Sequence, residues 1–130
     1  MAFETEAEKI NKGMLNAYQL IARERWRHTT RPTTNGEIKS SVIVPSALVI
    51  GISHGQESRI QPYELHVAKE INYRFLKPVH LGDAIRTRIR ITRLENNPDR
   101  EYGYAWVRRE IINQHNEVVY RANAKLLIKK

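Results

Sequence analysis

The stretch INYRFLKPVHLGDAIRTRIRI, residues 71–91, decides the fold. It begins with apolar residues at every second position, is interrupted at KPVHLGD (77–83), and resumes with arginine at every second position. Proline cannot donate to a sheet ladder, so Pro78 belongs at an edge, a bulge or a strand end. Gly82 and Asp83 favour a turn into the next strand. The interruption therefore predicts a connection between two long antiparallel strands.

The two-residue period continues to the end of the chain and predicts an antiparallel meander of four long strands. The segments ENNPDREYG (95–103) and NQHN (113–116) are typical of hairpin connections. Arg86, Arg88 and Arg90 alternate with apolar residues, which predicts a solvated outer face for them. The residues expected at core-like positions are Tyr63, Leu65, Val67, Ile71, Tyr73, Phe75, Ile85, Thr87, Ile89, Ile91, Tyr102, Tyr104, Trp106, Val118, Tyr120, Ala122, Ala124, Leu126 and Ile128.

The N-terminal half predicts two helices with a loop between them. Residues 4–25 carry apolar side chains at three- and four-residue spacing, with glutamates in the first turns, as in an amphipathic helix. Residues 27–41 are polar and rich in turn formers. The most apolar window favours a buried helix from Ser46 to Glu57 with Pro45 in its first turn, although its β-branched content leaves a strand open. The element order predicts one α+β domain over residues 1–130.

The composition limits the classes of function. The chain has 130 residues, 41% hydrophobic and 28% charged, which is ordinary for a globular domain. It contains no cysteine, which excludes a disulfide scaffold, a thiolate zinc site and a cysteine nucleophile. No apolar run is long enough to span a membrane, and the polar N-terminus lacks a signal-peptide pattern, so we expect a soluble cytoplasmic protein. The net charge of +8 suggests a polyanionic partner: nucleic acid, a phosphorylated cofactor or an acidic carrier protein.

Two motifs carry a resemblance to a known family. YRFLKPVHLGD (73–83) resembles the RF-x-x-PV-x-x-GD signature of hotdog-fold proteins that act on acyl thioesters, and among these the MaoC-like enoyl hydratases and dehydratases. INQHNEVV (112–119) resembles the NQ-x-GEVV turn of that family. The resemblance covers residues 4–130. It implies a hotdog fold, in which an antiparallel sheet wraps around a central helix. It also implies that the interruption at residues 77–83 shapes the mouth of an acyl channel.

The resemblance also implies an activity and an assembly. The expected reaction is hydration or dehydration of an acyl thioester of CoA or of an acyl carrier protein. The expected assembly is a homodimer whose sheets join edge to edge, with the pockets at the interface.

The catalytic residues of that family match this chain only in part. MaoC-like hydratases use an aspartate and a histidine a few residues apart, ahead of the central helix. His28 falls near the histidine position, whereas Arg23 occupies the aspartate position, with Glu24 as a substitute beside it. Related carrier-protein dehydratases use a glutamate within the helix, where this chain has Gly51. Because neither dyad is intact, a non-catalytic acyl-thioester-binding protein or an inactive subunit is an alternative.

His54 and Glu57, at the end of the apolar helix, form a second candidate pair. Some hotdog thioesterases activate water with an acidic residue on this helix, so an acyl-CoA thioesterase that uses Glu57 is another alternative. The residues themselves are more typical of a polar helix end, with His54-Gly55 as a stop signal. Asn35 could orient a water, although its place in Asn-Gly favours a turn.

Backbone groups and arginines are the expected substrate-binding features. If the helix begins at Pro45, the N–H groups of Ser46 and Ala47 have no partner within the helix and can polarise a thioester carbonyl. Arg86 and Arg88 could hold a CoA phosphate or the acidic surface of a carrier protein.

Metal and nucleotide cofactors are not expected. The five histidines lack the i, i+4 pairing of a helical zinc site, and there is neither a GxGxxG motif nor a P-loop. The core-like positions of the aromatic residues argue against nucleic acid as the partner.

Overall fold

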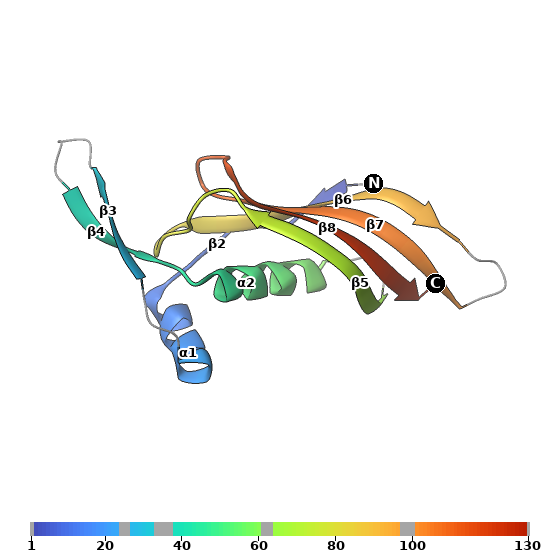
Figure 1. Ribbon diagram of the computed structural model, residues 1–130, viewed down its shortest axis with the longest axis horizontal. Coiled ribbons are helices and arrows are strands. Elements are labelled where there is room, and N and C mark those ends of the chain that lie inside the picture. The colour runs from blue at the N-terminus through green and yellow to red at the C-terminus, as the bar shows by residue number, and fades with distance from the viewer. Residues whose placement is uncertain (1, 24–26, 33–37, 61–63, 97–100, 130) are drawn as a thin grey trace.

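The computed structural model describes residues 2–23, 27–32, 38–60, 64–96 and 101–129, with the backbone alone for 27–32, 38–41 and 64–70. Figure 1 shows its elements and labels all of them except β1. They are β1 (Ala2–Glu4), β2 (Glu8–Lys9), α1 (Lys12–Ala22), β3 (Arg27–Pro32), β4 (Ile38–Ile43), α2 (Ser46–Ser58), β5 (Glu64–Phe75), β6 (Ala84–Glu95), β7 (Tyr102–Ile112) and β8 (Val118–Lys129).

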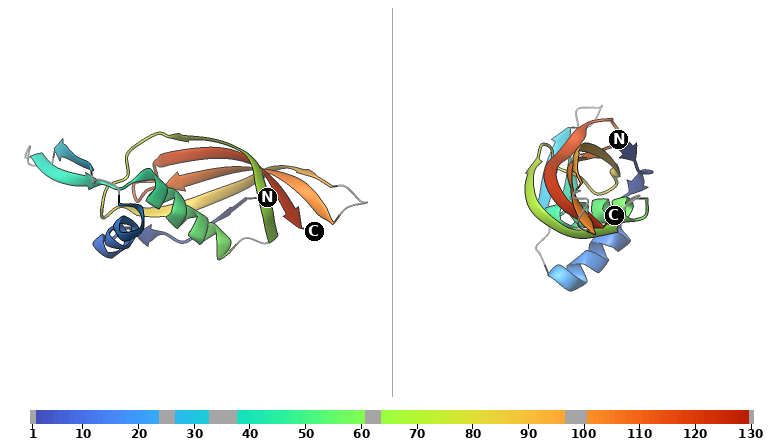
Figure 2. Two further views of the ribbon diagram at one scale, coloured as in Figure 1. Left: turned by 60° about the horizontal axis from the view of Figure 1, so that its bottom comes forward. Right: turned by 90° about the vertical axis from the view of Figure 1, so that its right-hand side faces the viewer.

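One antiparallel sheet, with the strand order β1-β6-β7-β8-β5, forms the body of the protein, and β2 also pairs with β6. The predicted meander is wrong for its first strand, because β5 pairs with β8 and not with β6. The sheet curls, and α2 lies along its concave side (Figures 1 and 2). We call the side toward α2 the inner face and the opposite side the outer face. An antiparallel sheet curled around a helix of these bounds confirms the α+β prediction and the helix predicted from Ser46.

The core lies between the inner face and α2. Along β6, Ile85, Thr87 and Ile89 are buried at every second position, while the intervening arginines lie on the outer face. One cluster surrounds Val49 of α2 and a second continues toward the far end of the sheet. The prediction of an outer face for Arg86, Arg88 and Arg90 is therefore confirmed.

The N-terminal helix is shorter than the predicted 4–25. Residues 2–4 and 8–9 are extended and pair with β6, because the edge of that strand offers unpaired backbone groups. The helix begins only after Asn11, whose side-chain oxygen accepts the N–H of Met14 at 2.9 Å and caps it.

The segment predicted as a polar loop, 27–41, contains strands. β3 and β4 pair with each other from Arg27–Ile43 to Pro32–Ile38 and project from the body as a hairpin (Figure 1). Threonine and isoleucine in these strands suit a pleated backbone, a preference that the polar composition concealed.

The aromatic residues of β7 occupy the opposite face from the one predicted. Gly103, Ala105 and Val107 are buried against the core, so Tyr104 and Trp106 lie on the outer face. Small side chains fit the inner face here because the curled sheet leaves little space inside it. The expectation that these aromatic residues lie apart from the basic residues is wrong.

Candidate functional site

The connection 77–83 joins three distant segments of the chain. The N–H of Val44 donates to Val79 O at 2.8 Å, and the N–H of Leu81 donates to Val42 O at 2.9 Å. Toward the N-terminus, Gly82 N–H donates to Ile10 O at 2.9 Å. The interruption in the opening stretch thus fixes the end of β4 and, directly after it, the start of α2.

Gly82 and Asp83 hold the shape of this connection. Gly82 has φ +95°, a conformation that glycine adopts at little cost. The buried Asp83 carboxylate accepts the N–H of His80 at 2.8 Å and the side-chain amide of Gln114 at 2.9 Å. Asp83 therefore connects the interruption to the NQHN turn, so the two motifs of the resemblance are in contact.

A cavity of about 300 Å³ lies between this connection and the start of α2. Its lining is apolar except for Ser46 and Lys77, and Lys77 is ion-paired with Glu117. Such a cavity suits an apolar chain with a polar end. The lining residues are Ile43, Val44, Ser46, Val49, Phe75, Leu76, Lys77, Pro78 and Val79.

The first turn of α2 directs backbone donors to the mouth of this cavity. Pro45 caps the helix, and its carbonyl accepts the N–H groups of Leu48 at 3.0 Å and Val49 at 3.2 Å. Ser46 and Ala47 precede these residues, so helix geometry gives their N–H groups no intrahelical acceptor. Both residues are exposed. The polarisation of a carbonyl oxygen by these N–H groups stays a prediction.

His28 lies on β3, where its backbone is paired with Val42. The next pair in the ladder joins Arg27 to Ile43, which lines the cavity. The start of the strand that carries His28 thus lies next to a lining residue of the cavity, while the role of His28 as a base stays a prediction. Glu24 and Asn35 lie outside the described residues.

Glu57, in the last turn of α2, points toward the sheet and forms a buried ion pair. Arg109 of β7 donates to its carboxylate, with an Nε–Oε2 distance of 2.7 Å. The charges of Arg109 and Glu57 both affect the pKa of His54, which lies one turn earlier on the helix. Burial and the positive charge of Arg109 lower the pKa of His54, while the negative charge of Glu57 opposes them. A water-activating Glu57 stays a prediction, and its carboxylate would have to leave Arg109.

Sequence reasoning missed Arg109 because it took the wrong face of β7 as the core. Starting from the buried Ala105 and Val107, the two-residue period places position 109 on the inner face. Tyr120 of β8 also lies there, and burial raises the pKa of its hydroxyl.

A second polar cluster joins α2 to β6. The hydroxyls of Ser53 and Thr87 are 2.6 Å apart, and Thr87 donates to the Gln56 side-chain oxygen at 2.8 Å. Gln56 in turn donates to the carbonyl of Ile85 at 2.9 Å. These buried groups satisfy one another, which fixes the rotation of α2 over the sheet.

The two arginines expected to bind substrate are held in ion pairs on the outer face. Arg86 pairs with Glu4, and Arg88 pairs with Glu110 at 2.8 Å. The start of α2 lies on the inner side of the sheet (Figure 2). A direct contact of these arginines with substrate stays a prediction.

Two features are absent from the residues that the structure describes. Among those residues, no group of three or more histidines, aspartates and glutamates is arranged to hold a metal ion. The helices of the same residues include none with the length and apolar character needed to cross a membrane.

The chain was compared with known proteins. Neither a family model nor a curated protein matches it. Solved structures do: the MaoC-like dehydratase from Rhodospirillum rubrum is 12% identical, with a TM-score of 0.77, and the match covers 100% of this chain and 91% of that one. The (R)-hydratase PhaJ1 from Pseudomonas aeruginosa is 18% identical, with a TM-score of 0.66, over 100% and 81% of the two chains.

A Mycobacterium tuberculosis protein described as a double hotdog fold is 19% identical, with a TM-score of 0.78. The match covers 99% of this chain and 41% of that one, so the chain spans less than half of that protein. Together with the strand order and the central α2, these matches confirm the fold implied by the motif at residues 73–83. The chain has the hotdog fold seen in MaoC-like proteins.

Proposed function

We propose that this protein is a hydratase or dehydratase that acts on an acyl thioester of CoA or of an acyl carrier protein. The observation that carries the proposal is the cavity between the start of α2 and residues 77–79, beside the strand that bears His28. The neighbours described as a MaoC-like dehydratase and an (R)-hydratase support this reaction class.

The proposed chemistry needs one base and one carbonyl-binding group. In hydration, His28 removes a proton from water as the oxygen bonds to the β-carbon of the enoyl thioester. The electron pair moves onto the thioester oxygen, where the N–H of Ser46 or Ala47 stabilises the enolate. A proton then adds to the α-carbon, and dehydration runs these steps in reverse. Glu24 is the carboxylate we assign to orient the water.

A second copy of this chain is the proposed partner. β5 is an edge of the sheet, and it exposes 47% of Ile71 and 63% of Tyr73. A long edge strand with apolar side chains is a template for strand pairing. Joining β5 to its symmetry mate extends the sheet and brings two cavities to one interface. We also propose a cytoplasmic location.

The test is turnover of crotonyl-CoA and 3-hydroxybutyryl-CoA, followed by the enoyl absorbance. We expect reversible interconversion, and loss of a general base in His28→Ala should lower kcat/KM by about 10²- to 10⁴-fold. The matched control is His115→Ala, because His115 is exposed in the turn after β7 and should leave the rate unchanged. An unaffected His28→Ala would remove His28 from the mechanism.

The same assay separates the alternatives. Release of free CoA without an enoyl product, abolished by Glu57→Gln, would replace the proposal with a thioesterase. Acyl-CoA binding without any turnover would replace it with a non-catalytic binding protein or an inactive subunit.

A further inference from the structure

The outer face carries a surface that the proposed reaction does not use. Cross-strand partners point to the same side of a sheet, so the pairings define rows on this face. One row runs Asn72–Asn123–Arg108–Arg90 across β5, β8, β7 and β6. The next runs Lys125–Trp106–Arg93 across β8, β7 and β6, and on β5 the backbone of Glu70 pairs with Lys125 at the end of this row. Amides, arginines and an aromatic ring therefore lie side by side over four strands.

Positive charge dominates these rows. Glu110 is shared by Arg88 and Arg121, both at 2.8 Å, so it balances only one of them. Arg90 and Arg108 are exposed neighbours in the ladder, and among the described side chains no ion pair involves either of them. The remaining charged side chains described on this face are Lys9, Arg74, Arg86, Arg93, Lys125 and Lys129, with Glu4 and Glu95.

The aromatic residues hold two of these cations in place. The guanidinium of Arg93 lies 4.6 Å from the centroid of the Trp106 ring. The ammonium of Lys125 lies 5.0 Å from that ring and 4.4 Å from the ring of Tyr104. A cation held over a ring loses less side-chain freedom when it binds an anion.

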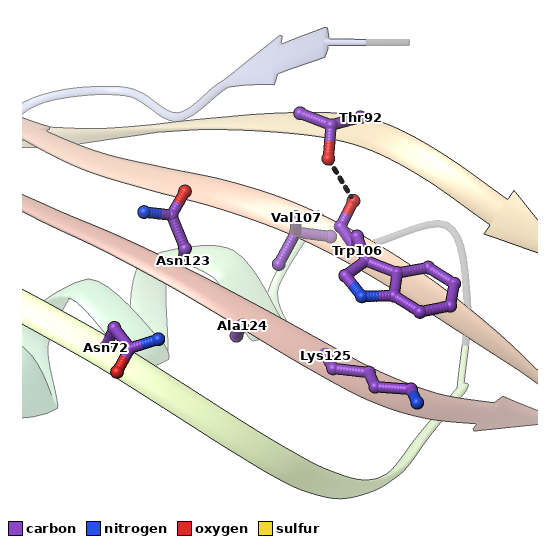
Figure 3. Close-up of a pocket in the computed structure, with 7 residues that line it drawn as sticks. All are labelled: Asn72, Thr92, Trp106, Val107, Asn123, Ala124 and Lys125. Carbon is purple, nitrogen blue, oxygen red and sulfur yellow. Dashed lines mark hydrogen bonds between the residues drawn. The ribbon is translucent and has the colours of Figure 1, made fainter.

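A hollow of about 260 Å³ opens among the same residues. Figure 3 shows Asn72 and Asn123 at one end of it and Trp106 and Lys125 at the other, while Val107 and Ala124, whose side chains belong to the core, form its floor. Thr92 at the rim donates its hydroxyl to the carbonyl of Trp106 at 3.1 Å. The two amides supply hydrogen-bond donors and acceptors, and Trp106 supplies an apolar wall.

We propose that the outer face binds single-stranded nucleic acid, with a base in this hollow and phosphates on Arg90, Arg108 and Lys125. A base has an aromatic face that can pack on Trp106 and polar edges that can hydrogen-bond to the amides of Asn72 and Asn123. The phosphates of the same strand can pair with the cations around the hollow. A duplex hides its bases, so it would leave the hollow unused. An acidic protein surface would engage the arginines but leave the amides and the ring without a matching group.

The binding test uses the chain's two tryptophans. Trp26→Phe leaves Trp106 as the single indole reporter. Fluorescein-labelled dT12 and rU12 are titrated by anisotropy, and unlabelled dT12 by tryptophan fluorescence. We expect quenching of Trp106 and a slope of log Kobs against log[NaCl] of about −2 to −4, as for three to five phosphate contacts. The tighter of the two oligomers identifies the natural strand.

The variants distinguish binding at the outer face from nonspecific attraction to the net positive charge of the protein. Arg90→Glu/Arg108→Glu should weaken dT12 binding by at least about tenfold, and Trp106→Ala by roughly five- to 150-fold. The matched control is Lys12→Glu/Arg23→Glu, which makes the same charge change at the exposed ends of α1 and should lose less than about threefold.

Four results would overturn the proposal. They are no binding of either oligomer in 50 mM NaCl, equal loss in the α1 control, binding of a 12-base-pair duplex as tight as that of dT12, and equal competition by poly-L-glutamate of the same charge. The last result would assign the face to an acidic protein. None of these readouts involves acyl-CoA turnover, so the proposal stands or falls separately from the reaction.

Discussion

Arg109 on β7 and Glu57 on α2 form an ion pair in which both side chains are buried. The two residues are 52 positions apart in the sequence, and the pair fastens the last turns of α2 to the inner face of the sheet. Two charges removed from water gain little net free energy from each other. Their loss one at a time is costly, because the remaining charge is left buried and alone.

The first prediction concerns this pair. Arg109→Leu should lower the free energy of unfolding by about 3–5 kcal/mol, whereas the double variant Glu57→Leu/Arg109→Leu should lose clearly less. Urea unfolding followed by circular dichroism measures both. The neighbouring Arg108→Leu is the matched control, because Arg108 is exposed and should change stability by less than about 0.5 kcal/mol. A double variant as unstable as the single one would contradict a charge-pairing role.

The pKa of His54 should report the same pair. Burial and Arg109 lower this pKa below the ordinary 6.5, so the neutral ring is favoured in the folded protein. The unfolded chain then binds a proton more readily, and this contribution to stability is lost as the pH falls from 6.5 through the folded pKa. Glu57→Gln removes the charge that raises the pKa and should lower it further. NMR titration of the ring measures it, and a wild-type pKa at or above 6.5 would refute the assignment.

The Glu110 carboxylate should contribute stability that acid removes. Although burial acts to raise its pKa, hydrogen bonds and charge from Arg88 and Arg121 lower it below the ordinary 4.5. The contribution is therefore complete above pH 4.5 and is lost as the pH falls through the folded pKa. Glu110→Gln should destabilise the protein at pH 7 and match the wild type in strong acid. Glu95→Gln, at the exposed end of β6, is the matched control and should leave the unfolding temperature at pH 7 nearly unchanged.

Much of the fold could be predicted because local chemistry marked its boundaries. Pro45 stands at the start of α2, and Pro78 and Gly82 lie in the connection between β5 and β6, as the sequence indicated. The strands at residues 2–4 and 8–9 could not be predicted, since they pair with the edge of β6, some 80 residues away in the sequence. Nothing local marks such a pairing.

The candidate site was predicted where it depends on backbone and missed where it depends on tertiary contacts. The start of α2 and the 77–83 connection follow from proline and glycine. The buried face of β7 does not follow from them, because apolar side chains occur at both the even and the odd positions of this strand. The larger Trp106 was taken as a core residue in place of Ala105. That error concealed both the buried Arg109 and the aromatic residues of the outer face.

Two glycines should respond in opposite directions to a methyl group. Gly82→Ala has open space for its Cβ, but φ +95° disfavours an L-residue, so we expect a loss of roughly 1–2 kcal/mol. Gly51, within α2, also has open space and has helical geometry, so Gly51→Ala should gain about 1 kcal/mol. Urea unfolding of both variants tests the pair. A stable Gly82→Ala would show that the connection can adopt another turn.

The final prediction tests the β5 edge as the contact between two copies. Ile71→Glu/Tyr73→Glu places two charges on the exposed apolar part of this strand and should convert a dimer to a monomer in sedimentation velocity. Leu20 and Ile21 of α1 are even more exposed, at 81% and 86%, so Leu20→Glu/Ile21→Glu is a demanding control. If β5 joins the copies, the control stays dimeric, because the pairing of strand edges holds them together. If the control dissociates and the β5 variant does not, the interface lies on α1 and the edge-to-edge arrangement is wrong.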